Sequence, residues 1–193
     1  MNSRTFMTTA ATAALVAWAP MSFALAQDTA PKDSIQADAK FVHHAVRDNA
    51  LEVRLGEVAQ RRAASPMVRK FAQRMVTDHT KMEKQWVDIA KKHGLEVEST
   101  LGPGGEQRVS RFQQADKASF DKEYMIAMIK GHTEDAAGLE FQIDSARSEP
   151  VRKMAAYALP IVRDHLLAAK AAGKEVGVDS AAVADSRKMA NTH

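Results

Sequence analysis

The sequence has no cysteine among its 193 residues. This absence excludes disulfide bonds, metal sites built from thiolates and a lipid anchor attached to a cysteine. Glycine and proline are also scarce, with nine and six residues, and they cluster at residues 102–105. That stretch, "GPGG", lacks the lysine and the preceding strand of a phosphate-binding loop, so it predicts a long connection between helices.

An excess of charge of one sign is also missing. The chain has 27 basic and 24 acidic residues, with no basic block and no alternation of aromatic with basic residues. Nucleic acid is therefore not an expected partner. After residue 26, no stretch is apolar enough to span a bilayer, so we expect no integral membrane segment in the mature chain.

The N-terminal segment has the pattern of a secretory signal peptide. Residues 1–4 carry a basic charge, residues 6–19 are apolar, and Ala24 and Ala26 form a small-x-small cleavage signal. We expect cleavage after Ala26. The mature protein is then predicted to be a soluble protein of the periplasm or a secreted protein.

The mature chain is dominated by helical periodicity. A polar, flexible arm is expected at 27–37, a four-helix domain at 38–172 and a weakly ordered tail at 173–193. Apolar residues recur at steps of three and four from residue 38 to residue 62, and the same spacing follows Ser65, Ser119 and Ser148. A further short helix is expected near 106–116, within the long connection. Because the other two connections are short, the pattern predicts an all-α, up-down-up-down four-helix bundle.

Three histidines fall on the apolar stripes of three different helices, namely His79, His132 and His165, and Glu52 falls on the stripe of the fourth helix. His132 lies 16 residues before the turn near Ser148 and His165 lies 17 after it. At the helical rise per residue, these two histidines should lie within about 1.5 Å of the same level. Glu52 lies 12 residues before the turn near Ala64 and His79 lies 15 after it, so their levels should differ by roughly 4.5 Å.

These residues suit a metal ion in the core of the bundle. Neutral imidazole nitrogens and a carboxylate oxygen favour iron, zinc, manganese or copper(II), and nearby methionines would add affinity for copper(I). Asp135, one turn after His132, is a second candidate carboxylate ligand, whereas Asp78 and Asp164 are better placed as outer partners or surface groups. The alternative is a structural cluster, in which the histidines form a polar network with Glu52 and Asp135 without any metal.

The chain also resembles a known family. The stretches "FAQRMVTDHTK", "FDKEYMIAMIKGH" and "ALPIVRDHLLAAK" contain the three histidines and resemble the signature stretches of domain-of-unknown-function family 4142. The segment "LEVRLGEVAQRRAASPMVRKFA" is similar to the usual beginning of that domain. The resemblance covers residues 39–172 and implies a secreted, ferritin-like four-helix bundle. It implies no activity.

A ferritin-like fold raises the question of a di-iron centre. Such centres place a glutamate three residues before each ligand histidine. In this sequence the corresponding residues are Val76, Ile129 and Val162, so a mononuclear, histidine-rich site is favoured.

Three functions remain open at this point. The first is metal binding for storage, buffering or stress protection, with iron, zinc or copper as the candidate ion. The second is a non-catalytic envelope-stress or interaction module, in which the buried histidines are structural or sense pH. The third, which the missing glutamates disfavour, is a metal-dependent oxidoreductase.

Overall fold

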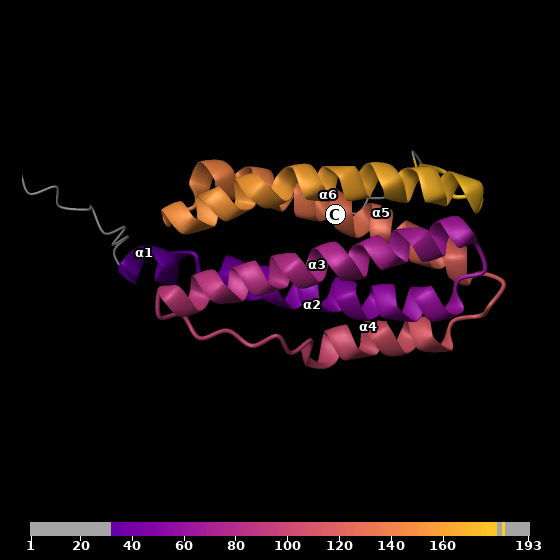
Figure 1. The fold of residues 1–193 in the computed structure, drawn as a ribbon, viewed down its shortest axis with the longest axis horizontal. Coiled ribbons are helices and arrows are strands. Elements are labelled where there is room, and N and C mark those ends of the chain that lie inside the picture. Colours follow the sequence, from indigo (N-terminus) through magenta and orange to yellow (C-terminus); the bar gives the residue numbers. More distant parts are fainter. Residues whose placement is uncertain (1–31, 181–182, 184–193) are drawn as a thin grey trace, which may run out of the picture.

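The computed structural model describes residues 32–180 and residue 183, and all regular secondary structure in that part of the chain is helical. The all-α prediction is therefore confirmed. Figure 1 shows the elements in chain order, with four long helices lying side by side and the shorter α4 along the outside of the bundle. The helices are α1 (Lys32–Ala37), α2 (Ala39–Arg62), α3 (Pro66–Lys92), α4 (Gly102–Gln114), α5 (Phe120–Ser145) and α6 (Glu149–Glu175).

The boundaries of α3 show how local sequence determines a helix. Ser65 precedes the helix, and its hydroxyl accepts hydrogen bonds from the backbone N–H groups of Met67 and Val68. Pro66 occupies the first helical position, where a missing N–H costs nothing. At the other end, Gly94 has a φ of +73°, a left-handed conformation that glycine adopts without strain. Both boundaries agree with the prediction.

The order of helix directions differs from the predicted one. Asp121, at the start of α5, accepts a hydrogen bond of 2.7 Å from the backbone N–H of Ser65, in the turn that precedes α3. At the opposite end, Asp38 accepts a bond of 2.7 Å from the N–H of Ser148. α3 and α5 therefore start at the same end of the bundle and run parallel, so the directions of α2, α3, α5 and α6 are up-down-down-up.

The position of α4 explains this difference in helix direction. After α3 the chain does not turn back directly. Instead, α4 packs along α2 and returns the chain to the end at which α3 began (Figure 1). One long crossover between two antiparallel hairpins is the connectivity of ferritin-like bundles.

The predicted arm and tail differ in part from the structure. Residues 32–37 of the expected arm form α1, in which Ile35 is buried, and α6 continues to Glu175, beyond the expected end of the domain. The predicted signal peptide, 1–26, lies outside the described residues, as does most of the tail. Within the described residues, no helix is both long enough and apolar enough to cross a membrane.

Two apolar clusters fill the bundle, and the three histidines lie between them. His79 is flanked along α3 by Met75, which belongs to one cluster, and by Met82, which belongs to the other. On α5, His132 similarly lies between Met128 and Ala136. Trp86 lies on the same apolar stripe of α3 as His79, and it is 1% exposed, as burial of that stripe requires. The fold therefore encloses a polar layer within an otherwise apolar core.

Candidate metal centre

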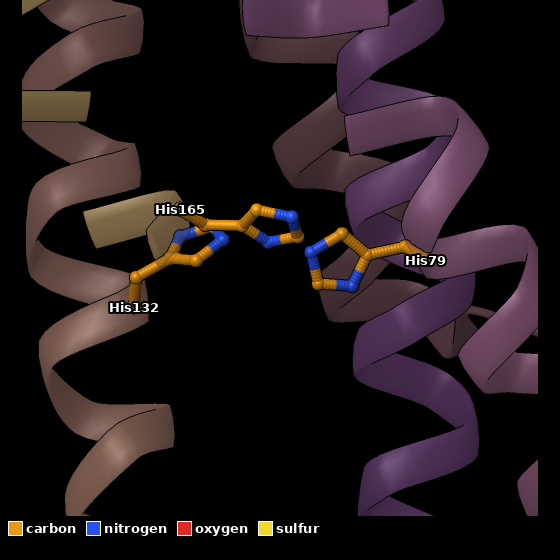
Figure 2. A group of neighbouring side chains, drawn as sticks. All are labelled: His79, His132 and His165. Atoms are coloured by element: carbon orange, nitrogen blue, oxygen red, sulfur yellow. The ribbon is translucent and has the colours of Figure 1, made fainter. Parts of the chain in front are cut away.

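The imidazoles of His79, His132 and His165 converge at mid-height in the bundle, one from each of α3, α5 and α6 (Figure 2). Their ring centroids are 5.5 Å apart for His79 and His132, 5.2 Å for His79 and His165, and 5.4 Å for His132 and His165. One nitrogen from each ring lies within 4.8 Å of the other two. The exposed fraction is 3% for His79 and 0% for the other two.

One nitrogen of each ring is occupied by a hydrogen bond to the surrounding protein. His132 Nδ1 lies 2.9 Å from the backbone carbonyl of Met128. His165 Nε2 lies 2.8 Å from the carboxylate of Asp78. His79 Nδ1 lies 3.0 Å from Oδ1 of Asn49. Because carbonyl and carboxylate oxygens only accept, the ring nitrogen is the donor in the first two bonds.

The orientation of Asn49 decides the third bond. Its amide nitrogen donates to the carbonyl oxygen of Ala45 at 2.7 Å, one turn earlier in α2. This bond directs the amide oxygen toward His79, so His79 Nδ1 must also donate. Each histidine is therefore held as one defined neutral tautomer.

The remaining nitrogens have no hydrogen-bond partner among the described residues. They are Nε2 of His79, Nε2 of His132 and Nδ1 of His165. In the tautomers assigned above, each of them carries a lone pair and no proton. Three buried lone pairs in one small group repel one another, and a cation between them would remove that cost. Histidines that bind metals characteristically donate their other N–H to a carboxylate or carbonyl, as these three do.

Burial also keeps the three rings neutral. It is the main cause that lowers the pKa of His79 well below its usual value, with further lowering from His132 and His165. Burial and His165 lower the pKa of His132 to about 4, although its bond to Met128 opposes the shift. The pKa of His165 is also lowered by burial, against the effect of Asp78. At neutral pH all three rings are therefore in the form that binds metal.

Glu52 and Asp135, the two predicted carboxylate ligands, lie beside the triad and do not belong to the group of atoms within 4.8 Å of one another. Both line a cavity of about 340 Å³ that His79 also lines. Glu52 is 6% exposed, and its Oε2 has no hydrogen-bond partner among the described residues. Whether any of the five predicted residues binds a metal stays a prediction.

The carboxylates of this cavity hold their protons more tightly than usual. Burial raises the pKa of Glu52 to about 7, with a contribution from Asp48, while Arg108 opposes the shift. Burial and the neighbouring Glu52 and Asp48 raise the pKa of Asp135 well above its usual value. The cavity thus places several acidic groups close together with too little positive charge to balance them.

Sequence reasoning identified the histidines but missed one of their partners. Asn49 was not among the predicted site residues. A stripe through Val42, Ala45, Asn49 and Glu52 has the same spacing of three and four, and all four of these residues are buried. Asp78 was expected as an outer partner of the site, and it accepts a hydrogen bond from His165.

The fold and the site together define a class of protein, a helical bundle with a buried histidine triad at its centre. The sequence places it in a family as well. The domain of unknown function DUF4142 matches residues 22–172, and the chain belongs to this family. The searches of curated proteins and of solved structures gave no match.

Proposed function

We propose that this protein binds a transition-metal ion at the triad of His79, His132 and His165. The observation that supports this most directly is the state of the six ring nitrogens. Three donate to acceptors of the protein, and the other three lie buried and free of protons. One nitrogen of each ring also lies within 4.8 Å of one nitrogen of each of the other two rings.

The donor set narrows the choice of metal. Three neutral imidazoles suit zinc, copper and iron, and they leave at least one coordination position of the ion for water or another ligand. The triad includes no carboxylate that could bridge two ions, and the sequence has no glutamate three residues before any of the histidines. A single ion therefore fits better than a di-iron centre.

The proposed setting is the periplasm or the exterior of the cell, following the predicted signal peptide. A buried site held by neutral ligands suits storage, buffering or protection against metal stress. The structural alternative, a polar network without metal, is less well supported because such a network would offer these nitrogens a hydrogen-bond donor, for example the protonated carboxyl group of Glu52. Those nitrogens are unpaired among the described residues.

The proposal predicts that metal-free protein takes up one equivalent of Zn(II), Cu(II) or Fe(II) and becomes more stable. A ligand at 100 times its dissociation constant adds about 2.7 kcal/mol to the folded state. For a domain of this size, that corresponds to a rise in Tm of roughly 5–10 °C. Calorimetric titration at neutral pH and thermal melts measure both quantities, and elemental analysis of protein from its native compartment identifies the ion.

The control for this titration removes the surface histidines. His43 is half-buried and His44 is exposed, and the pair is adjacent in sequence, so it is an obvious site for adventitious metal. A variant with His43→Ala and His44→Ala should keep both the stoichiometry and the shift in Tm. If the wild-type apo protein binds none of the three ions at neutral pH, the metal proposal is wrong and the structural alternative stands.

Metal binding should resist acid more than an ordinary histidine site. Imidazole binds metal only in its neutral form, so protons compete with the metal once the pH approaches the pKa of the histidines in the folded protein. Because the pKa of His132 is lowered to about 4, we expect Zn(II) affinity to change little down to about pH 6 and to fall steeply toward pH 4. Competition titrations at several pH values measure this. A decline centred near pH 6.5 would contradict the prediction.

The titration of Glu52 has to be separated from that of the histidines, because its pKa of about 7 lies close to pH 6.5, where a decline in affinity would contradict the prediction. Repeating the series with Glu52→Gln removes this carboxyl group and keeps the shape of the side chain. In this variant, Zn(II) affinity should fall at the same pH as in the wild type, because the histidines determine that pH.

A further inference from the structure

The cavity beside the triad extends from the buried His79 to exposed side chains. Most of its lining residues belong to α2 and α5, and α4 contributes Arg108. Its wall includes the buried side chains of His79 and Glu52 and also the exposed side chains of Arg108 and Glu134. An ion inside the cavity would therefore have His79 on one side and solvent on the other.

The charged groups of this cavity favour a cation. Four carboxylates line it, those of Asp48, Glu52, Glu134 and Asp135, against the single guanidinium of Arg108. His44 also lines the wall and pairs with Asp48 at 2.9 Å. Closely spaced acidic groups with low-dielectric walls raise the local concentration of positive ions.

Glu52 lies at the inner end of the cavity. One turn earlier on α2, Asn49 accepts the hydrogen bond of His79. Across the gap, a Cβ atom on Gly131 would be 3.8 Å from Glu52 Oε1, and Gly131 directly precedes His132 on α5. The Glu52 carboxylate thus lies between α2, which carries Asn49, and α5, which carries His132. Its Oε2 is unpaired among the described residues, and 6% of the residue is exposed.

A second cavity, of about 300 Å³, lies on the other side of the triad and offers a useful contrast. Asp78, the partner of His165, lines it, but none of the three histidines does. Its charges are balanced, since Arg74 and Lys81 accompany the two carboxylates of Asp78 and Asp164. It has neither the negative excess nor the contact with a triad imidazole that characterises the first cavity.

We propose that a divalent cation reaches the histidine triad through the cavity between α2 and α5, and that Glu52 binds it transiently and passes it to His79. This inference rests on the proposed metal function and adds the path of the ion. Asp48 and the exposed Glu134 attract the cation at the outer part of the path. Glu52 is then a transfer group, and not a permanent fourth ligand.

The two roles of Glu52 differ in kinetics. A group on the path lowers the barrier in both directions, so its loss slows uptake and release equally and leaves the dissociation constant unchanged. Loss of a permanent ligand instead speeds release and weakens binding. Stopped-flow mixing of apo protein with Co(II), followed by the visible absorption of the bound ion, gives the uptake rate. Displacement by a chelator gives the release rate.

We expect Glu52→Gln to slow Co(II) uptake about tenfold at low ionic strength, with release slowed by the same factor and the affinity unchanged. Glu134→Gln should slow uptake by a smaller factor and reduce its dependence on salt, because it weakens only the electrostatic attraction at the outer part of the cavity. The matched control is Glu140→Gln. Glu140 is also exposed and on α5, but it pairs with Arg163 and does not line the cavity.

The outcomes are distinguishable. If wild-type protein binds Co(II) and Glu52→Gln takes it up at the wild-type rate, the path is wrong and the metal site stands. If the variant binds more weakly through faster release, Glu52 is a permanent ligand, and the transfer role is also wrong. If wild-type protein binds no Co(II) or Zn(II), the proposed function fails first. Glu134→Gln keeps the test informative if Glu52→Gln folds poorly.

Discussion

Replacing Leu55 by aspartate should lower the stability of the bundle by more than about 4 kcal/mol. Leu55 is 0% exposed and lies in α2, within the same apolar cluster as Met75 and Met128. The substitution removes a buried side chain, which costs about 2–5 kcal/mol, and also places a carboxylate in an apolar environment. Thermal melts should show a fall in Tm of more than about 10 °C.

The control applies the same chemical change at an exposed position. Leu167, on α6, is 65% exposed, and Leu167→Asp should change Tm by no more than a few degrees. Equal effects at the two positions would mean that the buried and exposed faces of the helices are assigned incorrectly.

Replacing His132 by leucine should abolish the metal-dependent rise in Tm and leave the apo protein at least as stable as the wild type. Nε2 of His132 is buried without a partner among the described residues, and its other nitrogen bonds only to the carbonyl of Met128 in its own helix. Leucine has a similar size and removes this unpaired polar atom, which costs about 1–3 kcal/mol when buried. It also removes one of three proposed ligands. Affinity should therefore fall by more than the 10–100-fold that loss of an outer hydrogen-bond partner costs.

The opposite pattern identifies a structural histidine. If His132→Leu lowers the apo Tm by several degrees, and metal has no effect on either protein, the triad stabilises the fold and binds no ion. His93→Ala serves as the control, because His93 lies at the C-terminal end of α3, outside the triad, and should retain the full metal-dependent shift. Melts with and without Zn(II) provide all the required comparisons.

Local patterns were sufficient for the helices and for the histidine triad. The stripe on α3 predicted both the burial of Trp86 and the inward direction of His79, because a helix repeats its faces every three to four residues. The heights of His132 and His165 followed from counting residues outward from one tight turn. This worked because a short turn between antiparallel helices leaves little freedom in their register.

The carboxylates show the limit of such counting. Glu52 was predicted to share the site with the histidines, and it does lie in the core and line a cavity with His79. A level along the bundle does not determine how a helix is rotated about its own axis. Asp48 and Asn49 are neighbours in α2, and their side chains point about 100° apart around the helix axis. The rotation of α2 about its axis therefore decides which of the two faces His79.

Chain direction and charge environment depend on contacts between distant segments. The sequence by itself determined the number of long helices, both ends of α3, the buried faces of α3, α5 and α6, and the candidate triad of His79, His132 and His165, since each of these follows from local spacing. The tertiary structure alone decided that α4 crosses back along α2, which makes α3 and α5 parallel and brings Arg108 over the carboxylates of α2. It also decided which nitrogen of each histidine stays free. Both results arise from packing between helices far apart in the chain, and no periodicity within a single helix encodes them.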